Sequence, residues 1–484
     1  MIRLLALLFA LVAIVAPAAA QEARPRLIVL TDIGNEPDDQ MSLVRLLLYS
    51  NEIDIEALIA TTSVWQRDKV SPQIIAHVVD AYGQVQPNLR LHAQGWPSAA
   101  DLHARTFSGV TGYGLAAVHA DAPSPGALRL LDRARADDPR PLWITAWGGT
   151  NTLAEALDHA SRTLPVDEVA RIIARLRVYA ISDQDDAGPW LRRTYPGLFF
   201  IVSPSSQDSG DYARATWTGI SGDQFYRNGA GADFTTVSNA WLDRNIRSKG
   251  PLGAAYPRYL FIMEGDTPSF LGLIPNGLNA AENPNWGDWG GRYLLRQPSG
   301  EPRPIWTQGG DSFGRITSAD TVGGVTSDQA TIWRWREAFQ NDFAARMDWT
   351  IQPFAAANHP PVAVVGDDST TAPIRLEAVV GQPVRLDASA SHDADGNRLR
   401  YQWLAYPEAG FSGGIFGPPT LALTGSTSAR ATITPQATCT ANWLGLGTCP
   451  ASGTAHVILA VTDNGRPALT RYRRIILTVR QPAG

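Results

Sequence analysis

The segment RLIVLTDIGNEPDDQMSLVRLLLYS, residues 26–50, decides the fold. Its first apolar run, 27–30, predicts a buried strand, and apolar residues at helical spacing over 41–48 predict a helix. The turn between them carries four carboxylates within eight residues: Asp32, Glu36, Asp38 and Asp39. The segment therefore predicts a strand, an acidic turn and a helix, in that order.

Acidic side chains crowded at the end of a buried strand repel one another unless a cation or shared protons neutralise them. Oxygen-rich clusters of this kind suit calcium or magnesium. Acids are also common at helix N-termini, where they cap free N–H groups. Capping accounts for one or two acids, but Asp32 precedes the turn while Asp38 and Asp39 begin the helix. We therefore expect a metal or sugar site, because ligands gather at strand carboxyl ends in open α/β sheets.

The acidic turn resembles the N-terminal fingerprint of the nucleoside hydrolases, Asp-x-Asp-Pro-Gly-x-Asp-Asp, which holds a catalytic calcium in that family. The resemblance aligns Asp32 with the second Asp, Gly34 with the Gly, and Asp38 and Asp39 with the closing pair. Leu30 stands at the first Asp, and three residues replace one, so this turn is longer. The longer form, TDIGNEPDDQMSL, more closely resembles the nucleoside-hydrolase-like domain of envelope proteins described as cellulose-binding, over about residues 25–350.

Strand and helix patterns alternate through the first two thirds of the chain. This alternation predicts an α/β fold, with an open, mostly parallel sheet and helices on both faces. Strands are predicted over 55–60, 89–93 (weakly), 141–147 and 177–181, and helices over 72–82, 153–160 and 330–349.

Two further strand ends carry polar candidates. The segment GGTNTLAEAL, 148–157, resembles a nucleoside-hydrolase segment whose Thr gives a backbone carbonyl to calcium, and Asn151 aligns with that Thr. The alternative for this segment is an ordinary helix N-cap. The later segment 177–190 places Asp183, Asp185 and Asp186 after a strand, where they could bind sugar hydroxyls, supply a proton or bind a second cation. A solvated acidic loop is the alternative there.

The segment YLFIMEGDTPSFLGL, 259–273, predicts a third acidic strand end. By resemblance, Asp266 aligns with the last calcium ligand of nucleoside hydrolases, and Gly265 replaces a His that helps protonate the leaving base in part of that family. Glu264 could substitute as the acid, although successive strand side chains point to opposite faces.

The loop NPNWGDWGGRY, 283–293, combines Trp286, Trp289 and Arg292. Flat indole rings pack on the apolar faces of sugars, and guanidinium groups bind oxygen atoms in pairs, so this loop is a candidate sugar-binding surface. Trp190 is a further candidate. The alternative is a rigid loop in which the tryptophans have only a structural role.

The N-terminal 20 residues predict a secretory signal, with Arg3, an apolar run over 4–15 and an Ala-x-Ala site before Gln21. The mature protein is therefore expected to be periplasmic or secreted. No later segment has the apolar length of a membrane span. The net charge is -5 and there is no basic run, which argues against nucleic acid as a partner.

The segment NHPP, 358–361, marks a linker, assigned to 356–362, between an α/β domain over 21–355 and a second domain over 363–484. Short alternating runs predict an all-β, immunoglobulin-like sandwich. The sequence GQPVRLDASASHDADGNRLRYQW resembles the polycystic-kidney-disease-type (PKD) repeat of secreted polysaccharide-active proteins. Cys439 and Cys449 are the two cysteines of the chain, and in an exported protein they predict a disulfide.

Together these features predict an exported, Ca²⁺-dependent hydrolase that cleaves an N-glycosyl or related glycosidic bond in a sugar or oligosaccharide. The alternative is a non-catalytic protein that binds a cellulose-like polysaccharide. The predicted metal ligands are Asp32, Asp38, Asp39, Asp266 and the carbonyl of Asn151. The predicted catalytic groups are Asp32, Asp38 and Glu264. The predicted sugar contacts are Glu36, Asp183, Asp185, Asp186, Trp190, Trp286, Trp289 and Arg292.

Overall fold

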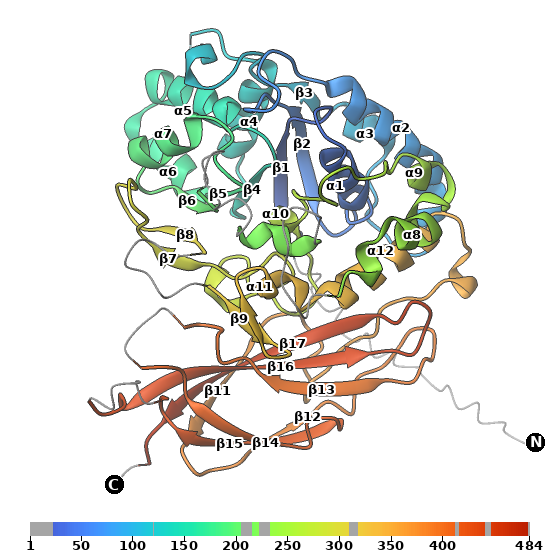
Figure 1. Ribbon diagram of the computed structural model, residues 1–484, viewed down its shortest axis with the longest axis vertical. Coiled ribbons are helices and arrows are strands. Elements are labelled where there is room, and N and C mark those ends of the chain that lie inside the picture. The colour runs from blue at the N-terminus through green and yellow to red at the C-terminus, as the bar shows by residue number, and fades with distance from the viewer. Residues whose placement is uncertain are drawn as a thin grey trace, which may run out of the picture.

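The computed structural model describes residues 23–119, 121–204, 215–221, 233–308, 318–411, 416–440 and 447–482. Within these ranges the chain forms an α/β unit around one large sheet, followed by two smaller β-sheets (Figure 1). The predicted signal segment, 1–20, lies outside the described residues. No helix in the described part of the chain has the length and apolarity to cross a membrane.

The large sheet has eight strands in the order β3-β2-β1-β4-β5-β6-β8-β7. All neighbouring strands run parallel except β7 and β8, which are antiparallel. The prediction of a mostly parallel sheet is confirmed. The strands are β1 (Arg26–Thr31), β2 (Asp54–Ala60), β3 (Thr106–Ser108), β4 (Leu142–Ala146), β5 (Leu176–Ala180), β6 (Phe199–Val202), β7 (Leu294–Arg296) and β8 (Ile305–Thr307).

Both faces of the sheet are covered by helices, as predicted. In β1, Leu27 and Val29 belong to one buried apolar cluster and Ile28 and Leu30 to another, because successive strand side chains point to opposite faces. The first cluster is formed with α1 (Asp38–Leu47), α2 (Pro72–Leu89) and α12 (Arg336–Asp348), among others. The second is formed with α4 (Pro125–Arg135), α5 (Asn151–Thr163), α6 (Val166–Arg175) and α7 (Ala187–Thr194).

Three element predictions differ from the structure. Residues 259–263, predicted as a strand, form irregular backbone that leads to the short helix α10 (Pro268–Leu271). Residues 89–93, predicted as a weak strand, are the end of α2 and the turn after it. The predicted helix 330–349 is divided into α11 (Ala330–Trp333) and α12. Short apolar runs do not distinguish a strand from a cavity wall or a helix end, since each buries apolar side chains.

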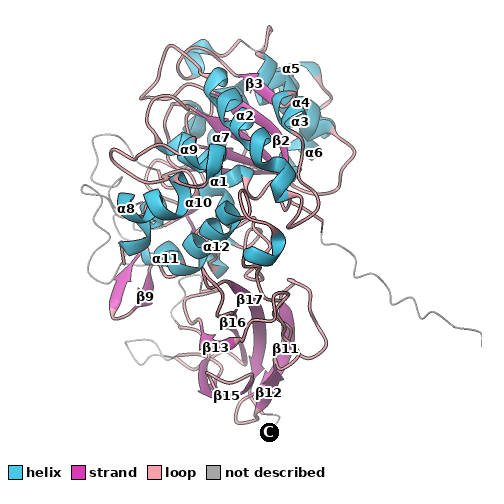
Figure 2. Cartoon of the chain, turned by 90° about the vertical axis from the view of Figure 1, so that its right-hand side faces the viewer, coloured by secondary structure: helices cyan, strands magenta, loops and turns pink. Residues whose placement is uncertain are grey.

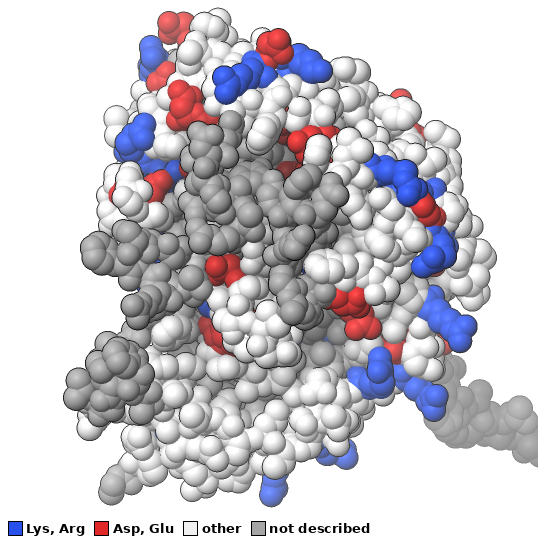
Figure 3. All heavy atoms as spheres, in the orientation of Figure 1, with Lys and Arg blue, Asp and Glu red and all other residues white. Residues whose placement is uncertain are grey.

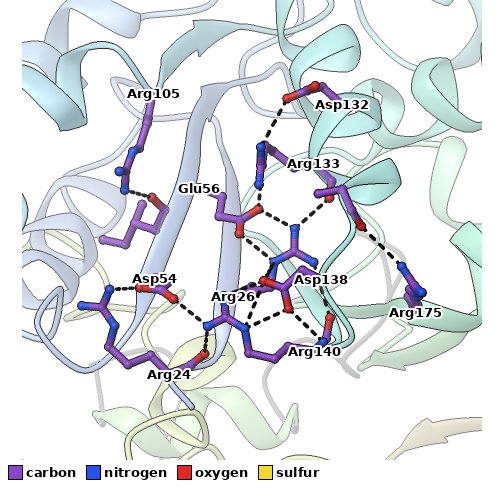
Figure 4. Close-up of polar contacts among 12 residues, drawn as sticks. Arg24, Arg26, Asp54, Glu56, Arg105, Asp132, Arg133, Asp138, Arg140 and Arg175 are labelled. Carbon is purple, nitrogen blue, oxygen red and sulfur yellow. Dashed lines mark hydrogen bonds and ion pairs between the residues drawn. The ribbon is translucent and has the colours of Figure 1, made fainter.

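Ion pairs link residues at the amino ends of the strands (Figure 4). Arg26, the first residue of β1, is buried and contacts Glu56 at 2.6 Å and Asp138 at 3.5 Å. Arg133 pairs with the same Glu56 at 3.1 Å, and Arg140 pairs with Asp54 at 2.6 Å. These pairs lie at the opposite end of β1 from the acidic turn.

The C-terminal sheets confirm the predicted all-β unit. Their own buried cluster begins at Ala363 and includes Trp403 and Leu477. Cys439 and Cys449 form the predicted disulfide, with a Cα–Cα distance of 5.5 Å. One sheet has the order β11-β17-β16-β13 and the other β12-β15-β14. The strands are β11 (Ile374–Val379), β12 (Val384–Asp387), β13 (Arg400–Ala405), β14 (Thr420–Thr424), β15 (Arg430–Ala437), β16 (Ser452–Thr462) and β17 (Thr470–Arg480).

The two units share a buried interface, with α11 and α12 between the large sheet and the C-terminal sheets (Figures 1 and 2). Arg474 of β17 donates to the carbonyls of Leu278 and Gly287, each at 2.6 Å. Arg471 pairs with Asp342 of α12 at 2.7 Å, and Tyr406 donates to Asp320 at 2.6 Å. The C-terminal unit is therefore held against the α/β unit by buried polar contacts.

Candidate functional site

The acidic turn lies at the carboxyl end of β1. Asp32 follows the strand and accepts a hydrogen bond of 2.5 Å from Ser63, which follows β2. Asp38 and Asp39 begin α1, and the Thr31 hydroxyl donates to Asp39. Residues of two neighbouring parallel strands thus fix Asp32 and Asp39: Ser63, after β2, bonds Asp32, and Thr31 of β1 bonds Asp39.

Asp266 joins this cluster from a distant part of the sequence. One carboxylate oxygen from each of Asp38, Asp39 and Asp266 lies within 4.8 Å of the others. Asp266 Oδ2 is buried and has no hydrogen-bond partner in the described part of the chain. The Asp266 carbonyl accepts from Ser269, and Ser269 accepts from the Trp147 indole at 2.9 Å. The backbone of Asp266 is therefore fixed while its carboxylate faces the other acids.

Burial and mutual repulsion make all four aspartates hard to ionise. Burial raises the pKa of Asp32 to about 6. Burial and the charges of Glu36 and Asp32 raise the pKa of Asp38 to about 8. The pKa values of Asp39 and Asp266 also lie well above the ordinary range, first because of burial and then because of the neighbouring aspartates. Such a cluster becomes stable when ionised only if positive charge is added.

The residues fit a calcium ion. Calcium binds six to eight oxygen atoms in flexible geometry, and carboxylates are its principal protein ligands. Asp38, Asp39 and Asp266 provide converging carboxylates, and the unpaired Asp266 oxygen is a donor that nothing else in the described residues uses.

The acids line a cavity of about 330 Å³. Acidic and aromatic side chains dominate its wall, a combination that suits a ligand with hydroxyl groups and an apolar face. The lining residues are Asp32, Asn35, Glu36, Asp38, Asp39, Trp65, Trp147, Ile181, Gln184, Trp217, Phe261, Ile262, Gly265 and Asp266.

The sequence patterns did not predict the aromatic part of this wall. Trp65 follows β2 and Trp147 follows β4, at the same edge of the sheet as the acids. The strand-end rule that located Asp32 could therefore have located these two tryptophans. Trp217 and Phe261 lie outside the parallel strands, and no comparable signal marks them.

Glu264 does not reach the cavity. It is fully buried and accepts hydrogen bonds from Arg45 at 3.2 Å, Tyr256 at 2.6 Å and Thr267 at 2.9 Å. Its backbone has φ 58°, a left-handed conformation that is uncommon outside glycine. This corrects the prediction of a catalytic acid, because its oxygen atoms are already committed to a buried arginine and two hydroxyl groups.

Asn151 and Asp185 form a structural connection beside the cavity. Asn151 is the first residue of α5, and its side-chain amide donates to Thr62 at 3.1 Å and to the Gly112 carbonyl at 2.8 Å. Its backbone N–H donates to Asp185 at 2.9 Å, and Asp185 also accepts from Thr150 at 3.1 Å and Ala187 at 3.0 Å. The structure therefore assigns Asp185 to tying two turns together. A calcium contact of the Asn151 carbonyl stays a prediction.

The other acids of that segment also have structural partners. Asp183 forms two hydrogen bonds, 2.8 and 2.9 Å, with Arg192. Asp186 accepts from the Leu115 backbone at 2.8 Å, and Trp190 packs edge-on against Tyr195. The cavity wall contains their neighbour Gln184 instead.

The loop 283–293 packs at the domain interface. Trp289 is fully buried against Phe339 and Tyr472, and Trp286 contacts His456 of β16. Arg292 is also buried and pairs with Asp320 at 2.8 Å. The structure thus gives the alternative role, a rigid structural loop, to residues predicted to contact sugar.

Gly265 allows close approach within the acid cluster. A Cβ atom at this position would lie 3.0 Å from the Asp38 carboxylate and 3.2 Å from the Trp217 ring. A histidine here would require Asp38 and Trp217 to shift. The packing around Gly265 therefore favours glycine over the histidine of the nucleoside-hydrolase pattern.

The parallel sheet, the acidic cluster at its carboxyl edge and the appended β unit define a nucleoside-hydrolase-like protein with a C-terminal β domain. Residues 26–293 match the family described as "Cellulose-binding Sde182, nucleoside hydrolase-like domain", and the chain belongs to this family. Residues 383–479 match "Cellulose-binding protein Sde0182, C-terminal domain". The resemblance inferred from the acidic turn is confirmed.

A solved structure from Saccharophagus degradans is similar over 95% of this chain and 100% of its own, with 35% sequence identity and a TM-score of 0.77. It is described as a nucleoside hydrolase-related hypothetical protein associated with carbohydrate metabolism. The effector protein XOO4466 and the type III effector XopQ complexed with adenosine diphosphate ribose are 12% and 13% identical. Each match covers 69% of this chain, and 95% and 96% of those chains, with TM-scores of 0.32 and 0.31 that are too low to support an argument. No curated protein matches the chain.

Proposed function

We propose that this protein is an exported, calcium-dependent glycoside hydrolase. The observation that carries the proposal is the convergence of Asp38, Asp39 and Asp266 in the wall of a cavity with aromatic sides. Membership of a cellulose-binding family supports a carbohydrate ligand. The disulfide supports an oxidising compartment outside the cytoplasm.

Asp38, Asp39 and Asp266 would hold the ion, with Asp32 beside them. When bound, calcium supplies positive charge that attracts water and vicinal sugar hydroxyls and makes them more acidic. The three ligand carboxylates orient the sugar by fixing where that charge lies. Orientation of the reacting groups is a large part of the rate gain in such sites.

Asp32 is the proposed general base. The Ser63 hydroxyl holds one oxygen of its carboxylate. Its pKa, raised by burial to about 6, suits a group that must accept a proton near neutral pH. Asp32 takes the proton from water as the water oxygen bonds to the anomeric carbon, and a single displacement of this kind inverts that carbon.

Glu36 is the proposed general acid. It lies on the wall of the same cavity, and burial raises the pKa of its carboxyl. It donates its proton to the leaving oxygen while the glycosidic C–O bond breaks. Glu264 is excluded from this role by its buried partners. Because Gly265 offers no side chain to protonate a nucleobase, we assign O-glycosides rather than nucleosides as substrates.

Carbohydrate binding without turnover is the second candidate function. Membership of a family described as cellulose-binding favours it. The absence of a side chain at Gly265, where part of the nucleoside hydrolase family supplies a proton donor, also favours it. Both functions use the same cavity, so product formation separates them.

The test is product release by the purified mature protein from p-nitrophenyl glycosides, plant oligosaccharides and nucleosides, with Ca²⁺ or with EDTA. We expect glycoside cleavage that requires Ca²⁺ and is lost in Asp39→Ala. Asp288→Asn is the matched control, because Asp288 is a buried carboxyl outside this cavity. Oligosaccharide binding without release would support the second function, and cleavage of nucleosides alone would contradict the substrate assignment.

A further inference from the structure

The cavity mouth carries aromatic side chains that the proposed chemistry does not use. Trp65 and Phe261 line the cavity and are 50% and 44% exposed. Trp147 and Trp217 line the same cavity but are buried. The aromatic wall therefore continues from buried rings to exposed ones, and a continuous exposed apolar surface of this kind is typical of ligand-binding grooves.

The size of the cavity limits how much ligand it encloses. Its volume of about 330 Å³ is near the lower end of the range for small-molecule sites. A single sugar unit suits this space, whereas a longer glycan must leave it through the mouth. On that path it passes Trp65 and Phe261, and flat aromatic rings pack well on the apolar faces of sugars.

Gln184, a lining residue of the cavity, has a side-chain acceptor that is unpaired among the described residues. Its side-chain NH₂ group donates to the Trp147 carbonyl at 2.5 Å. The Gln184 side-chain oxygen is therefore directed away from that carbonyl. Gln184 Oε1 is buried, has no hydrogen-bond partner in the described residues, and belongs to a side chain only 7% exposed. An unpaired buried acceptor is costly, and a sugar hydroxyl would satisfy it.

The charge of the wall selects against anionic ligands. The described lining residues include five carboxyl groups and no lysine or arginine. A single calcium ion neutralises only part of this charge. Neutral sugars are therefore favoured over uronic acids or phosphorylated sugars.

We infer that the cavity takes the terminal sugar of a neutral oligosaccharide or polysaccharide chain. A hydroxyl of that sugar donates to Gln184 Oε1, and the next sugar unit stacks on Trp65 and Phe261. This inference rests on the proposed function and names its substrate class. It makes the protein an enzyme that acts at chain ends.

The experiment measures the affinity of full-length mature protein, with Ca²⁺ present, for cello-, xylo- and manno-oligosaccharides of one to six units. Oligogalacturonides serve as the anionic comparison. We expect affinity to rise from one unit to two or three and then to level off in at least one neutral series. Weak binding of oligogalacturonides is expected, and tighter binding of them than of any neutral series would overturn the inference.

Two variants separate the two contacts. Trp65→Ala and Phe261→Ala should each lower the affinity for the trisaccharide about 2- to 10-fold and leave the monosaccharide unchanged, since aromatic stacking contributes this much. Gln184→Leu should lower the affinity at every length. Trp190→Ala is the control, a partly exposed tryptophan outside the cavity, and should change neither. Melting temperatures of all variants establish that they are folded.

Equal affinity at all lengths, no effect of Trp65→Ala, or no binding of any neutral series would overturn the inference. A calcium titration of the same samples tests the proposed function separately. Calcium-dependent cleavage without length dependence would remove only the chain-end inference. Length-dependent binding that ignores calcium would support chain-end binding of the sugar and remove calcium-dependent hydrolysis.

Discussion

Buried carboxylates lie in two regions of this protein. At the domain interface their charged neighbours are arginines, whereas in the cavity they are other carboxylates. At the domain interface, Asp320 contacts Arg292 and Arg334 at 2.8 and 2.5 Å. Asp342 contacts Arg346 and Arg471 at 3.1 and 2.7 Å. In the cavity, the clustered aspartates face one another, and none forms an ion pair with a described residue.

The pKa values express this difference. Burial alone would raise the pKa of Asp342, but Arg471 and Arg346 lower it to about 2. Burial raises the pKa of Asp38 to about 8, and Glu36 and Asp32 add to the effect. The interface acids are thus neutralised within the chain, whereas no lysine or arginine among the described lining residues supplies positive charge to the cavity acids. This is how a structural acid differs from a candidate ligand.

Removing an interface acid should cause the largest loss of stability. Asp320→Ala leaves Arg292 and Arg334 with an uncompensated buried charge, and we expect a loss of about 3–5 kcal/mol in the free energy of unfolding. Urea denaturation measures it. The control is Asp387→Ala, whose pair with Arg430 is exposed to solvent and should contribute little to stability. A similar loss in both variants would remove the distinction drawn for the interface.

Removing a cavity acid should not lower the free energy of unfolding in the absence of metal. Asp266→Asn relieves repulsion, so with EDTA we expect stability to stay level or to rise by about 1 kcal/mol. With Ca²⁺ at about 100 times its Kd, the wild type should gain about 3 kcal/mol and the variant should not. Thermal unfolding with Ca²⁺ or EDTA measures both effects. Destabilisation of the EDTA-treated variant as large as that of Asp320→Ala would contradict the comparison.

Acid should weaken the interface through Asp342. Its pKa of about 2 in the folded protein is below the ordinary 3.8, so its contribution is present above about pH 4 and is lost as the pH falls toward 2. The shift corresponds to about 2 kcal/mol. Denaturation between pH 6 and pH 2 should show this loss in the wild type and a smaller slope in Asp342→Asn. An equal slope in both would show that another group is responsible.

The sequence predicted the part of the site that follows strand order. Asp32, Asp38 and Asp39 lie beside a strand end, and the resemblance located Asp266 more than 220 positions later. The prediction failed where packing decides the role. Trp289 and Arg292 have the composition of a sugar-binding loop, yet their partners Tyr472 and Asp320 come from other segments. The first pairing depends on how the two units dock and the second on a contact between distant segments of the α/β unit, and local patterns encode neither.

The fold was predicted more completely than the cavity wall. Alternating apolar runs indicate strands and helices because their periods are fixed by backbone geometry. Phe261 lies in an apolar run that reads as a strand, but it lines the cavity. Among the described residues on the face in Figure 3, the basic side chains are scattered rather than gathered in one broad patch.

Calorimetric titration of Ca²⁺ into EDTA-stripped, full-length mature protein tests most directly whether the acid cluster binds calcium. We predict one bound ion per chain in the wild type and in Asp288→Asn, with binding abolished in Asp39→Ala. No binding by the wild type, or the same affinity in Asp39→Ala, would contradict this prediction.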